Sequence, residues 1–322
     1  MSGSGSGARP GVAGGSRVAI LLATYNGERF LRRQLESIAG QSHQDWFLVV
    51  SDDGSSDATL AIVDTFAHEV GVERVIVRDG PRRGFVANFL SMACAPEVVA
   101  DYFAFCDQDD VWLPEKLERA ISRLRAAPRG DHPARLYGGR TLLVDEHDRE
   151  LGLSRLCARR IGFENALVQS YAGANTMVFD AAARALLAAA GADVRVASHD
   201  WWLYLLVSGV GGSVVYDAHP TVRYRQHVHN AQGANNGVLA RFKRLRGLLA
   251  GQLRSWNGQH LESLSRVGSM LTRRNRALAE AFSSLRGAGG LAAVRQLRKV
   301  GVHRQSTSDD LALRLAALLR RL

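Results

Sequence analysis

Cysteine is scarce in this sequence of 322 residues, which contains only Cys94, Cys106 and Cys157. Their spacing forms no pair of the kind that closes a disulfide framework or that holds zinc in a Cys-x-x-Cys site. Both kinds of small cross-linked domain are therefore excluded. We interpret the thiols as reduced and the protein as intracellular.

Long apolar runs are also missing. No stretch of about eighteen apolar residues occurs, so the sequence predicts no transmembrane helix and a cytoplasmic location. The first 16 residues are rich in Gly and Ser and lack the apolar core of a signal peptide, so we expect residues 1–16 to form a flexible leader. With 46% hydrophobic residues, the remainder can bury one large domain and an appendage.

Acidic side chains are few between Arg241 and Leu322, where 17 Lys and Arg face 4 Asp and Glu. The chain before Arg241 carries 24 basic and 27 acidic residues, so the formal charge of +10 belongs to the tail. This change divides the chain into a domain at 17–236 and a basic helical extension at 237–322.

The extension lacks the interleaved aromatics and the Cys/His spacing of common nucleic-acid-binding modules. We therefore expect no nucleic-acid partner, and interpret the charge as directed at polyphosphate or an anionic membrane. A non-enzymatic protein that binds nucleic acid or another polyanion through this tail is the alternative from a different class.

The final segment, 308–322, has leucines at spacings of three and four, which predicts a basic amphipathic helix capped by Ser308. Such a helix lies in a membrane interface without spanning it, on the inner face of the cytoplasmic membrane. The alternative is packing on its own domain or on a second subunit of an oligomer. The predicted apolar stripe consists of Leu311, Leu315, Leu318, Leu319 and Leu322.

Strand-like apolar runs alternate with helical periodicity over roughly the first half of the chain. This alternation predicts an α/β fold with a mostly parallel sheet flanked by helices. Ligands of such sheets bind beyond the carboxyl ends of the strands, and the polar loops of this sequence lie there. The expected strands are 17–24, 45–51, 72–77 and 102–106, and the expected helices are 28–39, 57–69 and 85–92.

The loop Asp107-Gln108-Asp109-Asp110 follows the last of these strands. Alternate residues of an extended segment point to one side, so Asp107 and Asp109 can converge. Oxygen ligands of this kind suit Mg²⁺ or Mn²⁺ shared with phosphate oxygens. The alternative is an acidic turn that caps the next helix, a part that Asp110 could play.

Two further acidic segments have either a role in the site or a purely structural role. Asp52 and Asp53 follow the second strand, where a carboxylate can accept from a base N–H or a ribose hydroxyl, or can simply form the loop. Asp200 opens a helix that we expect to be capped by Ser198 and to bury Trp201 and Trp202. Its carboxylate is either a site residue or a partner of the helix dipole.

A segment near residue 225 gathers a cation, an imidazole and amides. Arg225 could stabilise a phosphate, and His227 could complete a metal site or contact a diphosphate, whereas a lone histidine is more often structural.

Taken in order, six motifs resemble glycosyltransferase family 2, and more narrowly its bacterial branch that includes rhamnosyltransferases of cell-surface polysaccharide assembly. The resemblance covers about residues 17–233. It implies the GT-A fold, a nucleotide-sugar donor and usually inversion at the anomeric carbon. The motifs are ILLATYNGERFLRRQLESI, VVSDDGSSDATL, GFVANF, FCDQDDVWLPEKL, HDWWLYLLVSG and YRQHVHN.

The resemblance also implies roles for residues at the matching positions. Asp107 and Asp109 would flank the diphosphate and a Mg²⁺ or Mn²⁺ ion that His227 approaches, and Asp200 would be the catalytic base. L-Rhamnose from dTDP-rhamnose is the best-matching donor, and the acceptor would be a hydroxyl of a cell-surface glycan or a lipid-linked glycan. The implied donor-binding set is Thr24, Tyr25, Asn26, Asp52, Asp53, Asn88, Asp107, Gln108 and Arg225.

Two departures from the family pattern bear on the sugar. The last motif more often reads YRQHGNN, whereas Val228 and His229 precede Asn230 here, and Arg82-Arg83 stands where an Asn commonly precedes Gly84. A sugar nucleotidyltransferase is the rival enzyme, but such enzymes open with a Gly-rich basic loop, and the first loop here reads TYNGERF.

Overall fold

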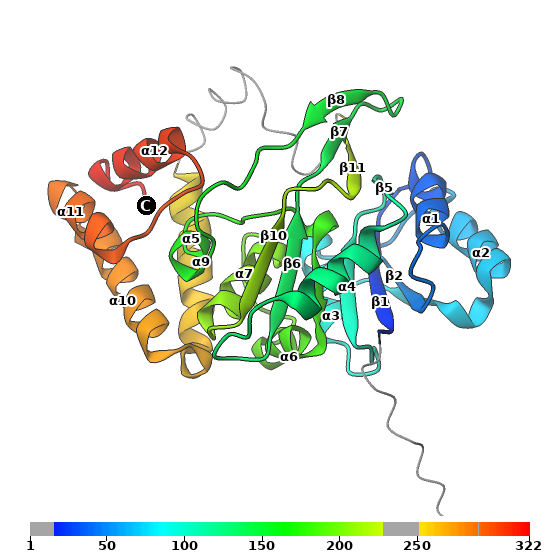
Figure 1. Cartoon of the computed structure of the whole chain (residues 1–322), viewed down its shortest axis with the longest axis horizontal. Coiled ribbons are helices and arrows are strands. Elements are labelled where there is room, and N and C mark those ends of the chain that lie inside the picture. The colour runs from blue at the N-terminus through cyan, green and yellow to red at the C-terminus, as the bar shows by residue number, and fades with distance from the viewer. Residues whose placement is uncertain (1–15, 228–250, 289) are drawn as a thin grey trace, which may run out of the picture.

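A seven-stranded sheet in the order β10-β6-β9-β4-β1-β2-β3 organises the computed structural model, which describes residues 16–227, 251–288 and 290–322 (Figure 1). All neighbours pair in parallel except β9, which runs antiparallel to both β4 and β6. The predicted α/β fold is confirmed. The strands are β1 (Val18–Thr24), β2 (Trp46–Asp52), β3 (Val75–Asp79), β4 (Tyr102–Cys106), β6 (Arg135–Gly139), β9 (Val178–Asp180) and β10 (Ser213–Asp217).

The central strands are apolar on both faces because helices cover both sides. Ile20 and Leu22 of β1 share one hydrophobic cluster with α1 (Leu31–Ala39), α2 (Thr59–Val70) and α4 (Lys116–Ala126). Ala19 and Leu21 belong to a second cluster with α3 (Phe85–Cys94), α6 (Ala181–Ala190) and α7 (His199–Gly209). The residue predicted to begin the third strand lies instead in a 3₁₀ turn, Val72–Arg74, and β3 is a partly exposed edge.

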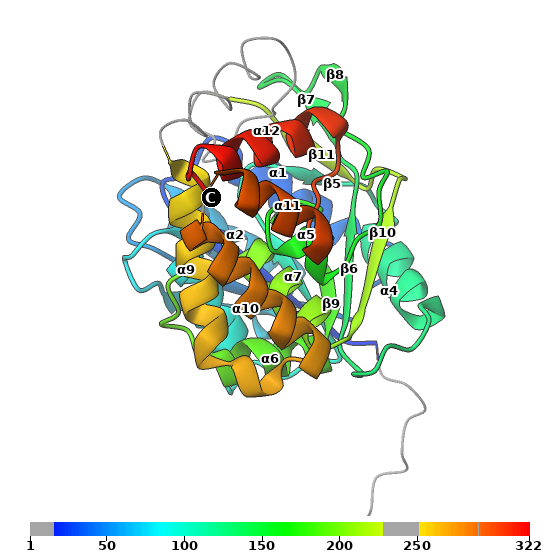
Figure 2. The ribbon, with the colours of Figure 1, turned by 90° about the vertical axis from the view of Figure 1, so that its left-hand side faces the viewer.

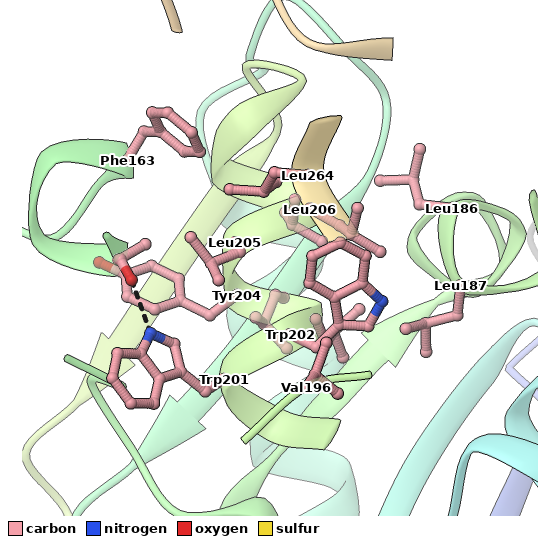
Figure 3. Close-up of a cluster of buried hydrophobic side chains, with 14 of the residues drawn as sticks. Phe163, Leu186, Leu187, Val196, Trp201, Trp202, Tyr204, Leu205, Leu206 and Leu264 are labelled. Atoms are coloured by element: carbon pink, nitrogen blue, oxygen red, sulfur yellow. Dashed lines mark hydrogen bonds between the residues drawn. The ribbon is translucent and has the colours of Figure 1, made fainter. Parts of the chain in front are cut away.

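Helix α7 is the centre of the second cluster (Figure 3). Trp201 and Trp202 are buried, as predicted, and the indole N–H of Trp201 donates to the carbonyl oxygen of Ala166 at 2.6 Å. Ser198 occupies the N-cap position, but its hydroxyl makes no capping hydrogen bond with the backbone. The predicted side-chain cap is therefore wrong.

A second, four-stranded sheet lies above the carboxyl ends of the main sheet in Figure 1, in the order β5-β11-β7-β8. Its strands are β5 (Val111–Trp112), β7 (Leu142–Val144), β8 (Glu150–Leu153) and β11 (Val222–Arg225). Strand β11 pairs antiparallel with β5, which directly follows the acidic loop. This pairing carries Arg225 and His227 back to that loop from far along the chain.

Four helices of the extension pack beside α7 (Figures 1 and 2). They are α9 (Gln252–Arg266), α10 (Arg273–Ala288), α11 (Gly290–Val300) and α12 (Thr307–Leu318). Leu264 of α9 and Phe282 of α10 are buried in the same cluster as α7, so the extension shares the core of the main domain. The predicted boundary at 236/237, and nearly all of the predicted leader at 1–16, lie outside the described residues.

Helix α12 confirms the predicted C-terminal helix but not the predicted capping residue. The capping residue is Ser306, whose hydroxyl accepts from the backbone N–H of Asp309, whereas Ser308 lies inside the helix. Within the described ranges, none of the helices has the length and apolar character needed to cross a bilayer.

Candidate active site

A cavity of about 1120 Å³ lies at the carboxyl ends of β1, β2 and β4. It extends from the loop after β2, which contributes Asp53, past Asp107 and Asp200 to a wall that contains Tyr171 and Tyr216. The polar loops that follow the parallel strands thus meet on one side, as the sequence predicts.

Thr24 and Asp52 end neighbouring strands, where the parallel register of β1 and β2 pairs them directly. The Thr24 hydroxyl donates to Asp52 Oδ1 at 2.8 Å, and the backbone N–H and the hydroxyl of Ser55 donate to the same carboxylate. Burial raises the pKa of Asp52, but hydrogen bonds from Ser55, Thr24 and Gly54 together lower it below its ordinary value. Asp52 is thus occupied in forming the loop.

Asp53 is the carboxylate of this pair that lines the cavity. It accepts from the backbone N–H of Arg82 at 2.6 Å and of Gly84 at 2.8 Å. These bonds fix the loop after β3, in which Arg82 has a left-handed φ of 56°. The Arg82 side chain also lines the cavity, so the unusual Arg82-Arg83 pair of the sequence contributes a cation to the site.

The loop after β1 is joined to the acidic loop by one amide. The backbone N–H of Tyr25 donates to Gln108 Oε1 at 2.9 Å, and Gln108 Nε2 donates to the Tyr25 carbonyl at 3.0 Å. Tyr25 and Gln108 both line the cavity. Asn26 is not among the cavity-lining residues. Its Oδ1 accepts from the backbone N–H of Ser56, so its amide holds the loop after β2 and does not face the cavity.

The acidic loop contains three carboxylates in three different environments. Asp107 lines the cavity, and its pKa rises to about 8 because of burial first and then the negative charges of Asp109 and Asp200. Asp110 is fully buried and accepts from Asn175 Nδ2 at 2.6 Å and from the Arg225 backbone N–H at 3.1 Å. The alternative that Asp110 caps the next helix is wrong, because α4 begins after Glu115.

Burial, followed by the charges of Asp109 and Asp107, raises the pKa of Asp110 well above its ordinary value. The acidic loop therefore holds carboxyl groups so close together that their ionised forms repel one another. A positive ligand on the cavity side would relieve this repulsion.

Arg225 and His227 approach the acidic loop from β11. The Arg225 guanidinium donates to the carbonyl oxygens of Asp109, Asp145 and Glu146, and it is not among the cavity-lining residues. The structure thus gives Arg225 a supporting position, and its predicted contact with phosphate stays a prediction. His227 Nε2 lies 2.8 Å from Asp109 Oδ2. The Val228, His229 and Asn230 positions of the motif lie outside the described residues.

Asp200 lies in the first turn of α7 and lines the cavity. Burial raises its pKa, while the Ser198 hydroxyl, the backbone N–H groups of Trp201 and Asp200 and the Ser170 hydroxyl oppose that rise. Ser198 therefore serves the carboxylate, not the helix end. A carboxylate that is buried yet reachable from a cavity is suited to proton transfer.

Several cavity-lining side chains were not predicted from the sequence. His199 is almost fully buried against Phe89, and neither of its ring nitrogens has a hydrogen-bond partner in the described chain. Burial lowers its pKa to about 3, so the ring is neutral. The buried hydroxyls of Tyr171 and Tyr216 make no hydrogen bond to any described residue. The predicted Asn88 also lines the cavity; its amide N–H donates to the Ser51 carbonyl, and its side-chain oxygen accepts no hydrogen bond within the described part of the chain.

Lys116 is a buried cation directly behind the acidic loop, and the sequence analysis missed it. Its Nζ lies 3.8 Å from the ring centroid of Trp112 and makes no hydrogen bond to any described residue. Burial lowers its pKa to about 7, whereas Cys106 and Asp110 act in the opposite direction. A lysine inside an amphipathic helix gives no sequence signal that distinguishes it from an exposed lysine.

A divalent cation fits these residues if a bound diphosphate supplies some of its ligands, because the protein side chains alone do not surround it. In the part of the chain that the structure describes, no three His, Cys, Asp or Glu side chains converge closely enough to hold a metal alone. Burial and the neighbouring carboxylates disfavour the charged form of Asp107, which a cation would restore, and His227 contacts Asp109. Mg²⁺ and similar cations take few protein ligands when diphosphate oxygens and water supply the others.

Comparison with protein-family models identifies residues 19–186 as a match to "Glycosyl transferase family 2". This match covers most of the first predicted strand, all of the other three, the acidic loop and β9. The chain belongs to glycosyltransferase family 2. Both the sugar nucleotidyltransferase and the non-enzymatic polyanion binder are thereby set aside as descriptions of the main domain.

Relatives of this family 2 glycosyltransferase include the dTDP-rhamnosyl transferase RfbG of Shigella flexneri, 29% identical over 70% of this chain and 78% of that protein. The Escherichia coli protein named UDP-Glc:alpha-D-GlcNAc-diphosphoundecaprenol beta-1,3-glucosyltransferase WfgD is 29% identical over 33% of this chain and 40% of its own length. The names of these two relatives differ in nucleotide and in sugar.

Solved structures support the GT-A fold of this family 2 glycosyltransferase. Staphylococcus aureus TarS 1–349 in complex with UDP-GlcNAc has a TM-score of 0.53 at 14% identity, over 95% of this chain and 89% of that one. The mannosyltransferase PcManGT of Pyrobaculum calidifontis, in complex with GDP-Man and Mn²⁺, has a TM-score of 0.50 at 17% identity, over 95% and 85%.

Proposed function

We propose that this chain is an inverting glycosyltransferase that moves L-rhamnose from dTDP-rhamnose to a hydroxyl of a cell-surface or lipid-linked glycan. One observation carries the proposal: Asp107 and Asp200 line a single cavity that also has a tyrosine-bearing wall. A donor diphosphate on the Asp107 side and an acceptor on the tyrosine side would meet beside Asp200. Similarity to a dTDP-rhamnosyl transferase over most of the chain supports the choice of donor.

The donor end of the cavity would be formed by Thr24, Tyr25, Asp53 and Asn88. Tyr25 is largely exposed to the cavity and offers a ring on which a base can stack, while Asp53 offers carboxylate oxygens to base or ribose donors. Gln108 holds Tyr25 in place through two backbone hydrogen bonds. Asn26, Asp52 and Arg225 would support this end without contacting the donor.

A Mg²⁺ or Mn²⁺ ion would be held by Asp107 and Asp109, with His227 beside Asp109. When bound, the ion supplies positive charge that stabilises the departing nucleoside diphosphate. Asp107 and Asp109 would be ionised in that state, because a nearby cation favours the charged form of a carboxyl group. His227 would fix the orientation of Asp109.

Asp200 would accept the proton of the acceptor hydroxyl as that oxygen attacks the anomeric carbon. Its burial raises the affinity of the carboxylate for a proton, which favours the transfer. The bond to the diphosphate breaks on the opposite face of the sugar, and the carbon acquires oxocarbenium character. One displacement of this kind inverts the anomeric configuration.

The acceptor, if lipid-linked, would place the enzyme at the inner face of the cytoplasmic membrane. The basic extension supports this location, because cations near an anionic surface are attracted to it. The name of WfgD contains a diphosphoundecaprenol acceptor, which is consistent with an acceptor of that class for this chain as well.

The test is a panel of nucleotide sugars, including dTDP-rhamnose, UDP-glucose and GDP-mannose, with release of nucleoside diphosphate as the readout and NMR of the product anomer. We expect metal-dependent turnover of dTDP-rhamnose and an inverted product. Preferential turnover of another donor would overturn the rhamnose assignment, and a retained configuration would overturn the single displacement.

A further inference from the structure

A second, smaller cavity of about 190 Å³ lies between the extension and the segment before α5 (Phe163–Ala166). Arginines dominate its rim: Arg159 from that segment, Arg298 from α11 and Arg314 from α12. Asp310 is the acidic residue of the lining, and the apolar side chains of Leu297 and Val302 complete it. Helices α11 and α12, which form most of the rim, face the viewer in Figure 2.

The charges of this arginine cavity do not balance. Arg159 is held in place, because its Nη1 donates to Asp310 Oδ2 at 2.6 Å and to the Arg304 carbonyl at 2.8 Å. The guanidinium groups of Arg298 and Arg314 make no ion pair or hydrogen bond with any residue in the described ranges. Two guanidinium groups therefore remain available to a ligand.

Phosphate is the anion that this arrangement suits. Guanidinium groups present a planar fork of N–H donors that matches phosphate oxygens, and several of them around one cavity give the charge and the direction needed. The apolar side chains of Leu297 and Val302 offer no acceptors that compete with the anion.

The neighbouring face of α12 indicates what the phosphate is attached to. Successive helical residues are rotated by about 100°, so Leu311 and Leu318, three residues before and four residues after Arg314, lie next to it on one side of the helix. This leucine face is solvent-exposed, with exposed fractions of 69% for Leu311, 38% for Leu315, 42% for Leu318 and 47% for Leu319. The opposite face, formed by Leu313, Ala316 and Ala317, is the one that packs on the protein.

We propose that the arginine cavity binds the phosphate group of an anionic membrane lipid while the leucine face rests among its acyl chains. Phosphate binding and an apolar face side by side match the two parts of an amphiphile, and a soluble phosphate compound would use only the first. Arg320 and Arg321, exposed at the end of α12, add to the attraction. The inference rests on the proposed membrane-side location, but not on the identity of the donor sugar.

The experiment measures binding of the full chain to vesicles of phosphatidylglycerol mixed with phosphatidylcholine, and to vesicles of phosphatidylcholine alone. The cavity variant is Arg298→Gln/Arg314→Gln. Its matched control is Arg273→Gln/Arg276→Gln, which removes the same charge from exposed positions of α10. We expect binding to phosphatidylglycerol vesicles that weakens about tenfold in the cavity variant and changes little in the control. Unchanged melting temperatures establish that both variants fold.

A second variant, Leu315→Gln/Leu319→Gln, tests the leucine face. It should bind the mixed vesicles more weakly while retaining the same salt dependence, and Leu60→Gln on the exposed side of α2 is its control. Equal weakening by the cavity variant and its arginine control would overturn the cavity in favour of general attraction. Arginine-dependent binding of inorganic phosphate without vesicle binding would overturn the lipid.

A second copy of the chain is the remaining occupant that the leucine face could have. The proposal would be overturned in favour of a dimer by two results together. The wild-type protein would dimerise in a concentration-dependent way that the leucine variant abolishes, and it would not bind anionic vesicles. Sugar transfer by the wild-type protein, measured without vesicles on a soluble acceptor, is a separate readout. Its failure would count against the proposed function and leave the vesicle result standing.

Discussion

His227 Nε2 lies 2.8 Å from Asp109 Oδ2, and its ring stacks on Phe30 with centroids 5.1 Å apart. His227 and Asp109 are separated by more than a hundred positions and meet because β11 pairs with β5 beside the acidic loop. His227 thus fixes the orientation of a proposed metal ligand from the far end of the main domain.

Replacing His227 with Ala should weaken donor binding in the presence of Mn²⁺ by about 10- to 100-fold, because the oriented partner of Asp109 is lost. Calorimetric titration of the donor with and without the metal measures this effect. His219→Ala is the control, since that exposed imidazole pairs with Glu115 away from the cavity. Unchanged donor affinity would make His227 a purely structural residue.

Asp109→Ala should abolish sugar transfer and metal-dependent donor binding while the protein stays folded. The side chain is partly exposed to the cavity, and its contact with His227 is the one hydrogen bond that it makes within the described ranges. Activity and thermal melting are measured together, with Asp64→Ala on the exposed side of α2 as the control. Full activity of the Asp109 variant in a chelator would show that the carboxylate holds no cation.

Asp200→Asn should lower turnover by about 10²- to 10⁴-fold with donor affinity preserved, because the amide keeps the shape but cannot accept a proton. Single-turnover kinetics and donor titration separate these two effects. A loss of donor binding with an unchanged chemical step would assign Asp200 to substrate positioning.

Asp217→Asn should destabilise the fold by about 3 kcal/mol, the low end for a broken buried pair, because Arg119 is partly exposed. Burial raises the pKa of Asp217, but hydrogen bonds from Arg119, the His219 backbone and Arg123 lower it well below its ordinary value.

Because the folded pKa of Asp217 lies below the unfolded value of about 3.9, its ionised form stabilises the protein above that pH. This contribution is lost as the pH falls through the folded pKa. Urea unfolding between pH 7 and pH 2 should therefore show the wild-type advantage over Asp217→Asn shrinking in acid. An exposed control, Asp193→Asn, should show little effect at any pH. A constant difference over this range would contradict the ion-pair account.

The central part of the fold could be predicted because its signals are local. Strands β1, β2 and β4 are runs of five to seven residues that are buried on both faces, and apolar runs of this length stand out in a sequence. The second sheet was missed because β5 and β7 have two and three residues, too few for any periodicity. Their pairing with β11 depends on contacts that are distant in the sequence.

The sequence predicts which loops form the site, but it does not predict which side chain of each loop faces the cavity. The sequence identifies the Asp52-Asp53 loop, yet only the structure distinguishes the carboxylate engaged by Thr24 and Ser55 from the one that faces the cavity. The same holds for α12, where the predicted leucine stripe turns out to be largely exposed and a different face, centred on Leu313, is buried. Amphipathic periodicity gives the helix but does not say which face the protein covers when Ala and Leu are interspersed.

Arg155, which lines the large cavity, pairs with Asp309 at 3.1 Å, and Arg159 pairs with Asp310, partners separated by 154 and 151 positions. Gln305, which lines the same cavity, is held by Gln169 and Asn165. The main sheet is made entirely of residues before Val222 and can assemble while the chain is still being synthesised. The part of the cavity wall formed by Arg155 and Gln305 depends on residues 305–309, so a chain that stops before Gln305 would have an assembled sheet and an incomplete binding cavity.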